Sequence, residues 1–154
     1  MAIIVSALLI GLVAGLRSLT APAAVSWGAY FGLLPLQGTP LAFLGFSAVP
    51  YMLTVLAIAE LVVDQLPQTP SRKAPLGFGV RVVTGALCGA AIGAAHAALV
   101  VGLIAGVVGA VIGTLAGYEA RNRLARAMGR DTPAAVLEDL VAIAGAAMIV
   151  GALA

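Results

Sequence analysis

The chain has 154 residues, of which 62% are hydrophobic and only 9% are charged. A soluble domain usually carries about 25% charged residues, so this chain has too few to cover a surface that faces water. Its net charge of +2 is too small to favour nucleic acid as a partner, and its single cysteine cannot form an intrachain disulfide. We therefore expect an all-α integral membrane protein in a lipid bilayer.

The N-terminal part of the chain contains one charged residue. Residues 3–17 form an apolar segment that is short for a membrane span, and it ends at Arg17 within the stretch GLVAGLRSLTAP. A guanidinium keeps its proton, so Arg17 needs an acidic partner or a route to water. The next segment, 19–36, contains prolines and aromatic residues that favour the headgroup level. Two arrangements remain open: 19–36 crosses the membrane, which makes six segments, or it is re-entrant, which makes five.

The middle of the chain contains a membrane span with an acidic end. Residues 41–63 are long and apolar enough to cross the hydrocarbon, and Pro50 predicts a kink within them. The span ends in Glu60 and Asp64, which are four residues apart and therefore share one face of a helix. Two carboxylates so placed repel each other, so either one holds a proton near neutral pH or both share a cation or an arginine.

The stretch Val82–Tyr118 carries no charge, and it is too long for one helix across about 30 Å of hydrocarbon. We expect two helices, 80–98 and 101–118, with a tight turn near Ala98–Gly102. His96 would then lie within the first helix. We expect it to hydrogen-bond to a neighbouring helix rather than to relay protons.

The last predicted segment is a helix over residues 134–153. Thr132 is expected to cap its N-terminus, and Pro133 fits the first helical position. Glu138 and Asp139 fall in its first two turns. The helix dipole favours acidic residues there, so capping explains this pair about as well as a functional role does.

Basic residues gather in two predicted loops, 64–79 and 119–133. Because Lys and Arg favour the cytoplasmic side of a membrane, both loops are expected to be cytoplasmic. Two segments join the loops, which brings them to the same side, and the C-terminus then faces the opposite side. The basic residues are Arg72 and Lys73 in the first loop, and Arg121, Arg123, Arg126 and Arg130 in the second.

Glycines recur four residues apart, as in Gly11 and Gly15, and such stripes let helices approach closely. The pattern favours packing within the protein, and it is also typical of a homo-oligomer seam, with a dimer favoured. A weak internal repeat relates Leu9–Arg17 to Val111–Arg121. In the five-segment arrangement the two units insert in opposite directions, as inverted repeats do in many transporters.

Arg17, Glu60 and Asp64 carry the functional prediction, because charges within a membrane are expensive unless they are paired or hydrated. If 19–36 crosses the membrane, all three lie at the cytoplasmic end and pair directly. If it is re-entrant, Arg17 lies too far from the carboxylates. We favour the crossing form because it supplies Arg17 with partners. Arg81, at the start of the following helix, completes the set of pathway or ion-coupling candidates.

Three stretches of the chain resemble a known family. They are GLR at Gly15–Arg17 followed by Pro22, AELVVDQLPQTPSR at Ala59–Arg72, and RVVTGALCGAAIG at Arg81–Gly93. Together they resemble the small bacterial membrane proteins designated domain of unknown function 4126, over nearly the whole chain. Gln65 stands where that family usually has a lysine. The resemblance implies the bacterial cytoplasmic (inner) membrane and brings no established activity.

Two functions fit these observations. The first is a small helical transporter or channel-like protein that moves an ion or small solute, coupled to protons or cations through its carboxylates. The second is a non-transporting scaffold whose arginine-rich loop, 119–133, binds anionic lipid headgroups or a partner. A membrane enzyme is disfavoured because the chain shows no nucleophile–base pair, and no Cys or His pair has metal spacing. No cofactor is expected.

Overall fold

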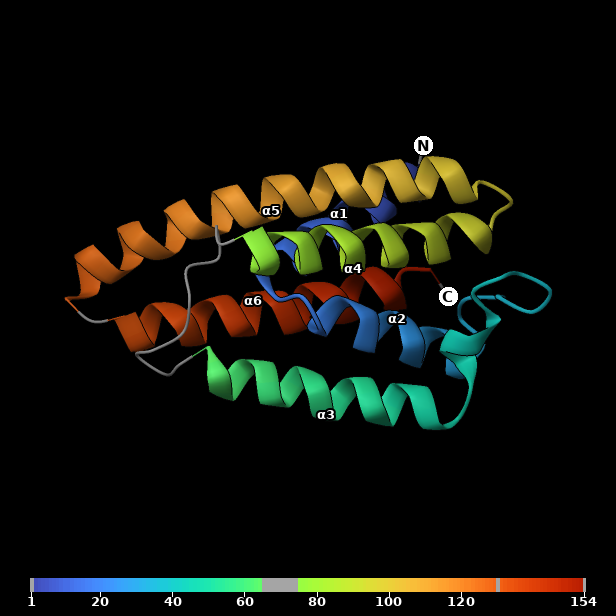
Figure 1. Ribbon diagram of the computed structural model, residues 1–154, viewed down its shortest axis with the longest axis horizontal. Coiled ribbons are helices and arrows are strands. Elements are labelled where there is room, and N and C mark those ends of the chain that lie inside the picture. Colours follow the sequence, from blue (N-terminus) through green and yellow to red (C-terminus); the bar gives the residue numbers. More distant parts are fainter. Residues whose placement is uncertain (1, 65–74, 130, 154) are drawn as a thin grey trace.

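The computed structural model describes residues 2–64, 75–129 and 131–153, and this part of the chain is helical without strands. Helices that follow one another along the chain alternate in direction (Figure 1): α1, α3 and α5 run toward one end of the bundle, and α2, α4 and α6 return. A short 3-10 turn, η1, precedes α3. The elements are α1 (Ala2–Leu16), α2 (Thr20–Tyr30), η1 (Ala42–Gly45), α3 (Ala48–Val63), α4 (Pro75–Ala94), α5 (Leu99–Met128) and α6 (Asp131–Gly151).

Three helices of the described residues are long and apolar enough to cross a membrane: α4, α5 and the part of α6 from Thr132 to Gly151. The helices α1 and α3 are apolar but shorter. At 1.5 Å per residue, α1 is about 22 Å long and α2 about 16 Å, both less than the hydrocarbon thickness. The long apolar helices support the prediction of a membrane protein.

Glycines bring α1, α4 and α5 into backbone contact. A methyl group added to Gly106 of α5 would overlap the carbonyl oxygen of Gly85 in α4, and one added to Gly11 of α1 would overlap the carbonyl oxygen of Gly106. Gly109 and Gly113 of α5 face the backbone of α1 in the same way. The helix α5 therefore contacts α4 with one glycine stripe and α1 with another, and these glycines face partners within the chain.

The contacts between α1 and α5 show that the two helices are parallel. Gly11 lies against Gly106, and Gly15, one turn later, lies against Ala110. The alternative in which the units Leu9–Arg17 and Val111–Arg121 insert in opposite directions, which required the five-segment arrangement, is therefore wrong. The reason is that α2 reverses the chain after α1, so three α-helices, α2, α3 and α4, separate α1 from α5 and restore its direction (Figure 1).

The helix α3 lies at the edge of the bundle farthest from α5 (Figure 1) and packs on α2 and η1. Only Pro50 and Ala57 of α3 are buried. Trp27 of α2 donates a hydrogen bond from Nε1 to Thr54 Oγ1 at 2.9 Å, and its ring meets that of Tyr51 edge to face. Large apolar side chains of α3, such as Met52, Val55 and Val62, are exposed, which fits a lipid-facing helix.

Several predicted boundaries shift. Pro50 is the third residue of α3 and falls in its first turn, where a missing N–H costs nothing, so it does not kink the helix. The predicted loop 119–133 is wrong for residues 119–128, which continue α5 because they are rich in Ala, Arg, Leu and Met, and an i,i+4 Arg123–Glu119 pair supports the helix.

Two smaller corrections concern the ends of α4 and α6. His96 lies in the exposed turn after α4 rather than within a helix, and its Nδ1 lies 3.0 Å from the carbonyl oxygen of Ile92 in its own chain segment. The helix α6 begins at Asp131, before Thr132, so Thr132 lies inside the first turn and does not precede it.

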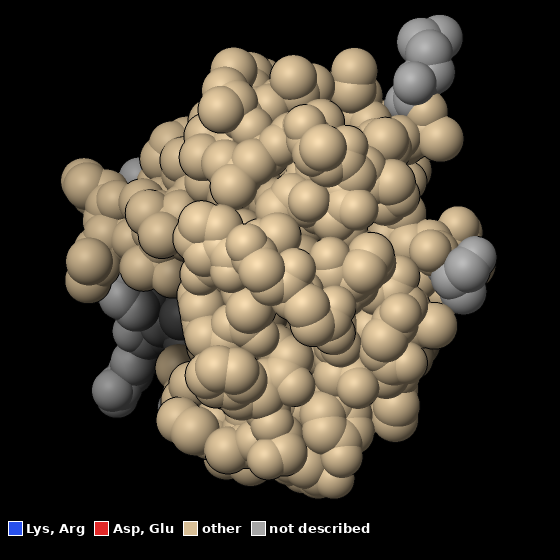
Figure 2. All heavy atoms as spheres, turned by 90° about the vertical axis from the view of Figure 1, so that its right-hand side faces the viewer, with Lys and Arg blue, Asp and Glu red and all other residues tan. Residues whose placement is uncertain are grey.

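Charge divides the two ends of the bundle. We call the end where α3 and α5 finish and α4 and α6 begin the charged end, and the opposite end, with the turns 31–47 and 95–98, the neutral end. Figure 2 looks onto the neutral end and shows no Lys, Arg, Asp or Glu on that face. The sequence has none between Ser18 and Ala59 or between Val82 and Tyr118.

Candidate functional site

The candidate site forms where α1 breaks and α2 begins. Arg17 still continues α1, because its N–H bonds to the carbonyl oxygen of Val13 at 2.8 Å, but α2 starts only at Thr20. Leu19, the residue that precedes α2, has no side chain able to cap the helix. The first backbone N–H groups of α2 therefore need acceptors from elsewhere in the fold.

The break lies inside the bundle, although the helices around it extend further. Asp139, which contacts Arg17, lies eight residues after the first residue of α6, or about 12 Å along the helix. Thr114, against which Gly15 packs, lies 14 residues before the end of α5, or about 21 Å. Arg17 is thus well below the outermost residues of the charged end.

The guanidinium of Arg17 is fully buried and holds two aspartates. Its Nη1 donates to Asp64 Oδ2 at the end of α3, and its Nη2 forms an ion pair with Asp139 Oδ1 of α6. Neither Arg17 Nη2 nor Asp139 Oδ1 has a hydrogen-bond partner among the described residues, so the contact between them is an ion pair without an accompanying hydrogen bond. The side chains of Asp64 and Asp139 are only 14% and 11% exposed. One arginine therefore links three helices.

Glu60 caps the start of α2 from outside. Its Oε1 accepts hydrogen bonds from the backbone N–H of Ser18 at 2.9 Å and from the Ser18 hydroxyl, and its Oε2 accepts from the N–H of Leu19 at 2.8 Å. The carboxylate thus satisfies the N–H groups of the two residues that immediately precede α2. The helix dipole adds a favourable interaction with its negative charge.

The acidic residues that contact Arg17 are only partly those predicted from the sequence. The break lies at the same end of the bundle as Glu60 and Asp64, and Asp64 pairs with Arg17. Glu60 was expected to pair with Arg17 as well, but its carboxylate binds the backbone of the next two residues instead. For Asp139 the sequence left helix capping and a functional role equally open, and the structure places it against Arg17. Its place within an apolar helix was the signal for this pairing.

Arg81 lies at the level of the break along the bundle. It precedes by one turn Gly85, whose added methyl would lie 3.6 Å from the Ala14 side chain in α1. Arg81 is 6% exposed, and its Nη1 donates to the carbonyl oxygen of Gly77 at 3.4 Å. The fourth predicted candidate is therefore buried near the same depth as Arg17.

The predicted lipid-binding arginines lie farther out on α5. The nearest guanidinium and carboxylate atoms of Arg121 and Glu138 are 3.8 Å apart. Arg123 bonds Glu119 at 3.0 Å with its side chain 75% exposed, and Arg126 is exposed. Three of the predicted basic residues, Arg72, Lys73 and Arg130, lie outside the described residues.

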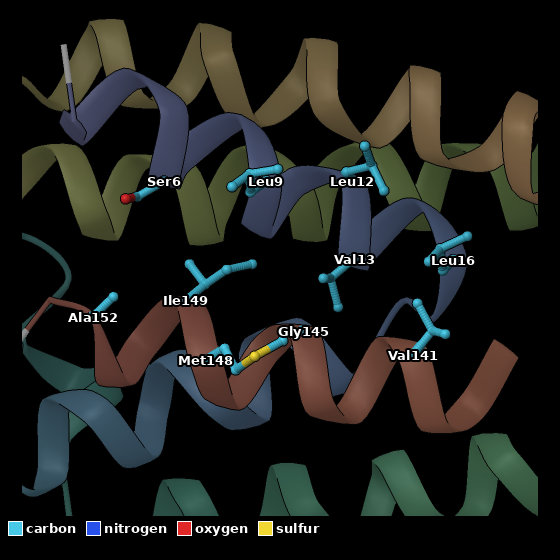
Figure 3. A pocket seen from close by; sticks show the side chains of 10 residues that line it. All are labelled: Ser6, Leu9, Leu12, Val13, Leu16, Val141, Gly145, Met148, Ile149 and Ala152. Atoms are coloured by element: carbon cyan, nitrogen blue, oxygen red, sulfur yellow. The ribbon is translucent and has the colours of Figure 1, made fainter. Parts of the chain in front are cut away.

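Two apolar grooves flank the site. One, of about 440 Å³, lies between α1 and α6 (Figure 3), where Leu9, Val13 and Leu16 face Val141 and Ile149. Ser6 contributes the one side-chain oxygen to its lining (Figure 3).

The other groove has a volume of about 430 Å³ and lies between α2, α3 and α6. It begins beside the break at Thr20 and Leu61 and includes Trp27 and Phe31 farther along α2. The groove between α2, α3 and α6 therefore adjoins the residues around Arg17 through Thr20. The groove between α1 and α6 has no polar residue of the break in its lining.

The Arg17 site also includes a hydroxyl that sequence reasoning missed. Thr20 is the first residue of α2 and is 8% exposed, and its Oγ1 has no hydrogen-bond partner among the described residues. The motif Arg-Ser-Leu-Thr thus places a guanidinium, two hydroxyls and two backbone N–H groups in four successive residues. No protein-family model, curated protein or solved structure matches the chain.

Proposed function

We propose that the protein is a small membrane transporter that moves an ion or small solute along the α2–α3 side of the bundle. One observation carries the proposal: the carboxylates of α3 attach a peripheral helix to a buried helix break. Glu60 holds the backbone of Ser18 and Leu19, and Asp64 holds Arg17. Broken helices with charged partners at membrane depth are typical of transporter binding sites.

A permanent attachment would not need this chemistry. Well-packed apolar residues often stabilise as well as or better than a buried ion pair, because the charges need not be desolvated. Only two residues of α3 are buried, so the polar contacts make up much of its attachment at the charged end. Such contacts respond to protonation, whereas apolar packing does not. This supports α3 as the moving element.

Glu60 is the best candidate for the coupling residue. Its ionised carboxylate accepts three hydrogen bonds from Ser18 and Leu19. A protonated carboxyl is neutral and carries a donor, so it loses the attraction to the start of α2 and one of its acceptor positions. Binding a proton would therefore weaken the hold of α3 on the break and favour opening between α2 and α3.

The same proposal includes the membrane arrangement. Six segments, with a short α2 completing the crossing, place the charged end in the cytoplasm and both termini on the opposite side of a bacterial inner membrane. The unequal distribution of charge between the two ends supports this orientation. We further propose a homodimer, and membership of the family designated domain of unknown function 4126 on the residues Gly15–Arg17, Ala59–Arg72 and Arg81–Gly93.

The test is flux in proteoliposomes across a panel of protons, alkali cations, halides and organic acids. Glu60→Gln should reduce the flux of the transported solute at least tenfold. Glu119→Gln is a matched control, because Glu119 is a half-exposed carboxylate on α5 that lies outside the proposed path. Unchanged flux in a folded Glu60→Gln protein, or no flux of any solute in the wild type, would contradict the proposal.

A second candidate function is anionic-lipid binding without transport, and the extension of α5 favours it. Residues 119–128 continue as helix and present Arg123 and Arg126 outward. Each basic residue near an anionic membrane surface contributes about 1 kcal/mol. Replacing Arg121, Arg123 and Arg126 by Gln would then release anionic lipid, and Glu60→Gln would lower stability only.

A further inference from the structure

The start of α2 is built as a binding site for a carboxylate. The N–H groups of Ser18 and Leu19 point to one acceptor group, the Ser18 hydroxyl joins them, and the residue before them is Arg17. Glu60 is the present occupant, and it shows that a carboxylate satisfies this set of donors with both of its oxygens. It reaches the site from another helix, so the occupant is not a local cap.

Two buried polar groups beside this site remain unsatisfied. Thr20 Oγ1 and Arg17 Nε have no hydrogen-bond partners among the residues that the structure describes. Thr20 is 8% exposed and Arg17 is fully buried. A buried polar atom without a partner is unfavourable, so these two atoms indicate capacity for a polar ligand.

The groove between α2, α3 and α6 provides space for the rest of such a ligand. Thr20 belongs to its lining, and so does Leu61, which follows Glu60 in α3. From there the groove extends past Ala57 toward Trp27. Its volume of about 430 Å³ lies within the range of about 300–1,000 Å³ that is usual for small-molecule sites. Its walls are mostly apolar, which suits an organic rather than an inorganic anion.

We propose that the site of Ser18, Leu19 and Thr20 binds a small organic carboxylate, which replaces Glu60 as the acceptor of their hydrogen bonds. The inference rests on the proposed transport function and names its substrate class. Glu60 leaves when it takes up a proton, and the incoming carboxylate brings one negative charge to the place that Glu60 gave up. The local charge is unchanged, and one proton moves with one carboxylate.

Chemical rescue tests the binding site without requiring transport. Glu60→Ala removes a CH2–COO⁻ unit, which acetate replaces almost atom for atom. In purified detergent-solubilised protein, acetate should raise the Tm of Glu60→Ala by several degrees. Acetamide, which is neutral and of similar shape, should leave it unchanged, as should chloride at equal ionic strength. Wild type and Glu119→Ala are the controls, and acetate should shift neither.

Thr20→Val examines the unsatisfied hydroxyl. In the Glu60→Ala background it removes Oγ1 and keeps the shape of the side chain. The carboxylate of Glu60 does not reach Oγ1, but acetate is not tethered and can move toward it. Because a hydrogen bond to a charged group is among the stronger ones, the acetate concentration needed for half of the Tm shift should rise about tenfold in Thr20→Val. If Glu60→Ala does not fold, Glu60→Gln retains one acceptor oxygen and should show a smaller acetate shift. Equal shifts with acetate and acetamide, or no acetate shift in either Glu60 variant, would overturn the proposal.

The outcomes separate this proposal from the transport function. An acetate shift together with absent flux would leave the binding site standing and remove transport. Proton or cation flux that Glu60→Gln abolishes, together with no acetate shift, would retain transport and remove the carboxylate as its substrate. Uptake of radiolabelled lactate by wild-type proteoliposomes, inhibited by acetate but not by acetamide, would support both.

Discussion

The α1–α4–α5 layer and the α3 edge of the bundle are held together by different interactions. In the layer, glycines allow backbone to touch backbone, as where Gly106 lies between Gly11 and Gly85. At the edge, α3 buries two residues and depends on Glu60 and Asp64 for its contacts at the charged end. The first kind of contact depends on shape alone. The second depends on charge and therefore on protons.

This difference assigns separate roles to the two regions. Helices joined by their backbones cannot separate or slide without losing many close contacts at once, so the layer is suited to be a rigid frame. A helix attached through carboxylates can be released by adding protons. Arg17 belongs to both regions, because it ends the glycine-containing helix α1 and binds Asp64 of α3. Variants of the two regions should therefore fail in different ways.

The largest effect is expected at Arg17. Arg17→Met would leave Asp64 and Asp139 buried without their cation, and breaking a buried pair in this way costs about 3–5 kcal/mol. Unfolding of the purified protein in mixed micelles measures this loss. Arg126→Met is the matched control, because Arg126 is exposed on α5. Equal losses in the two variants would mean that the buried cluster does not hold the helices together.

A smaller loss is expected in the layer. Gly106→Ala would force a methyl group against the carbonyl oxygen of Gly85 and so destabilise the protein by about 1–3 kcal/mol. Gly79→Ala is the control, since no atom lies within 4 Å of the added methyl and alanine favours helix. The same unfolding measurement should show Gly79→Ala at or above wild type. Because the contacts of this layer depend on shape and not on charge, the loss of unfolding free energy in Gly106→Ala should be independent of pH. A strong pH dependence would contradict the distinction between the layer and the α3 edge.

The smallest effect is expected at Arg123. Its pair with Glu119 is largely exposed, with the two side chains 75% and 52% accessible, so Arg123→Ala should change stability by less than about 0.5 kcal/mol. The amount of anionic lipid that stays bound during purification distinguishes the lipid-binding alternative from transport. Unchanged retention in a variant lacking Arg121, Arg123 and Arg126 would remove the lipid-binding alternative, whereas a loss would favour it over transport.

Much of the fold could be predicted from the residue pattern. The long uncharged stretch Val82–Tyr118 required two helices, and the structure has them as α4 and α5 with the turn three to four residues earlier than expected. The extension of α5 over 119–128 was missed because clustered charge next to an apolar run is also the pattern of a solvated loop. Helix propensity within the cluster, rich in Ala, Arg and Leu, was the better guide.

The candidate site was partly predictable. A lone arginine in an uncharged region needs acidic partners, and Asp64 could be predicted as one of them. Asp139 could not be assigned to Arg17 from the sequence, because an acid near a helix start has a sufficient local explanation. The roles of Glu60 and Asp64 could not be distinguished from the sequence either. The two differ by one helical turn, and only their positions relative to the break decide which meets the guanidinium and which meets the backbone.

The sequence by itself indicated a lipid environment, an all-α fold and the need for a group that neutralises Arg17. These follow from the composition and from the cost of an unpaired charge. Only the tertiary structure decided that α2 turns back beside α1, that α1 and α5 are parallel, and that Glu60 caps α2. These features depend on which helices meet at the break. Contacts between residues more than forty positions apart have no local signal in the chain.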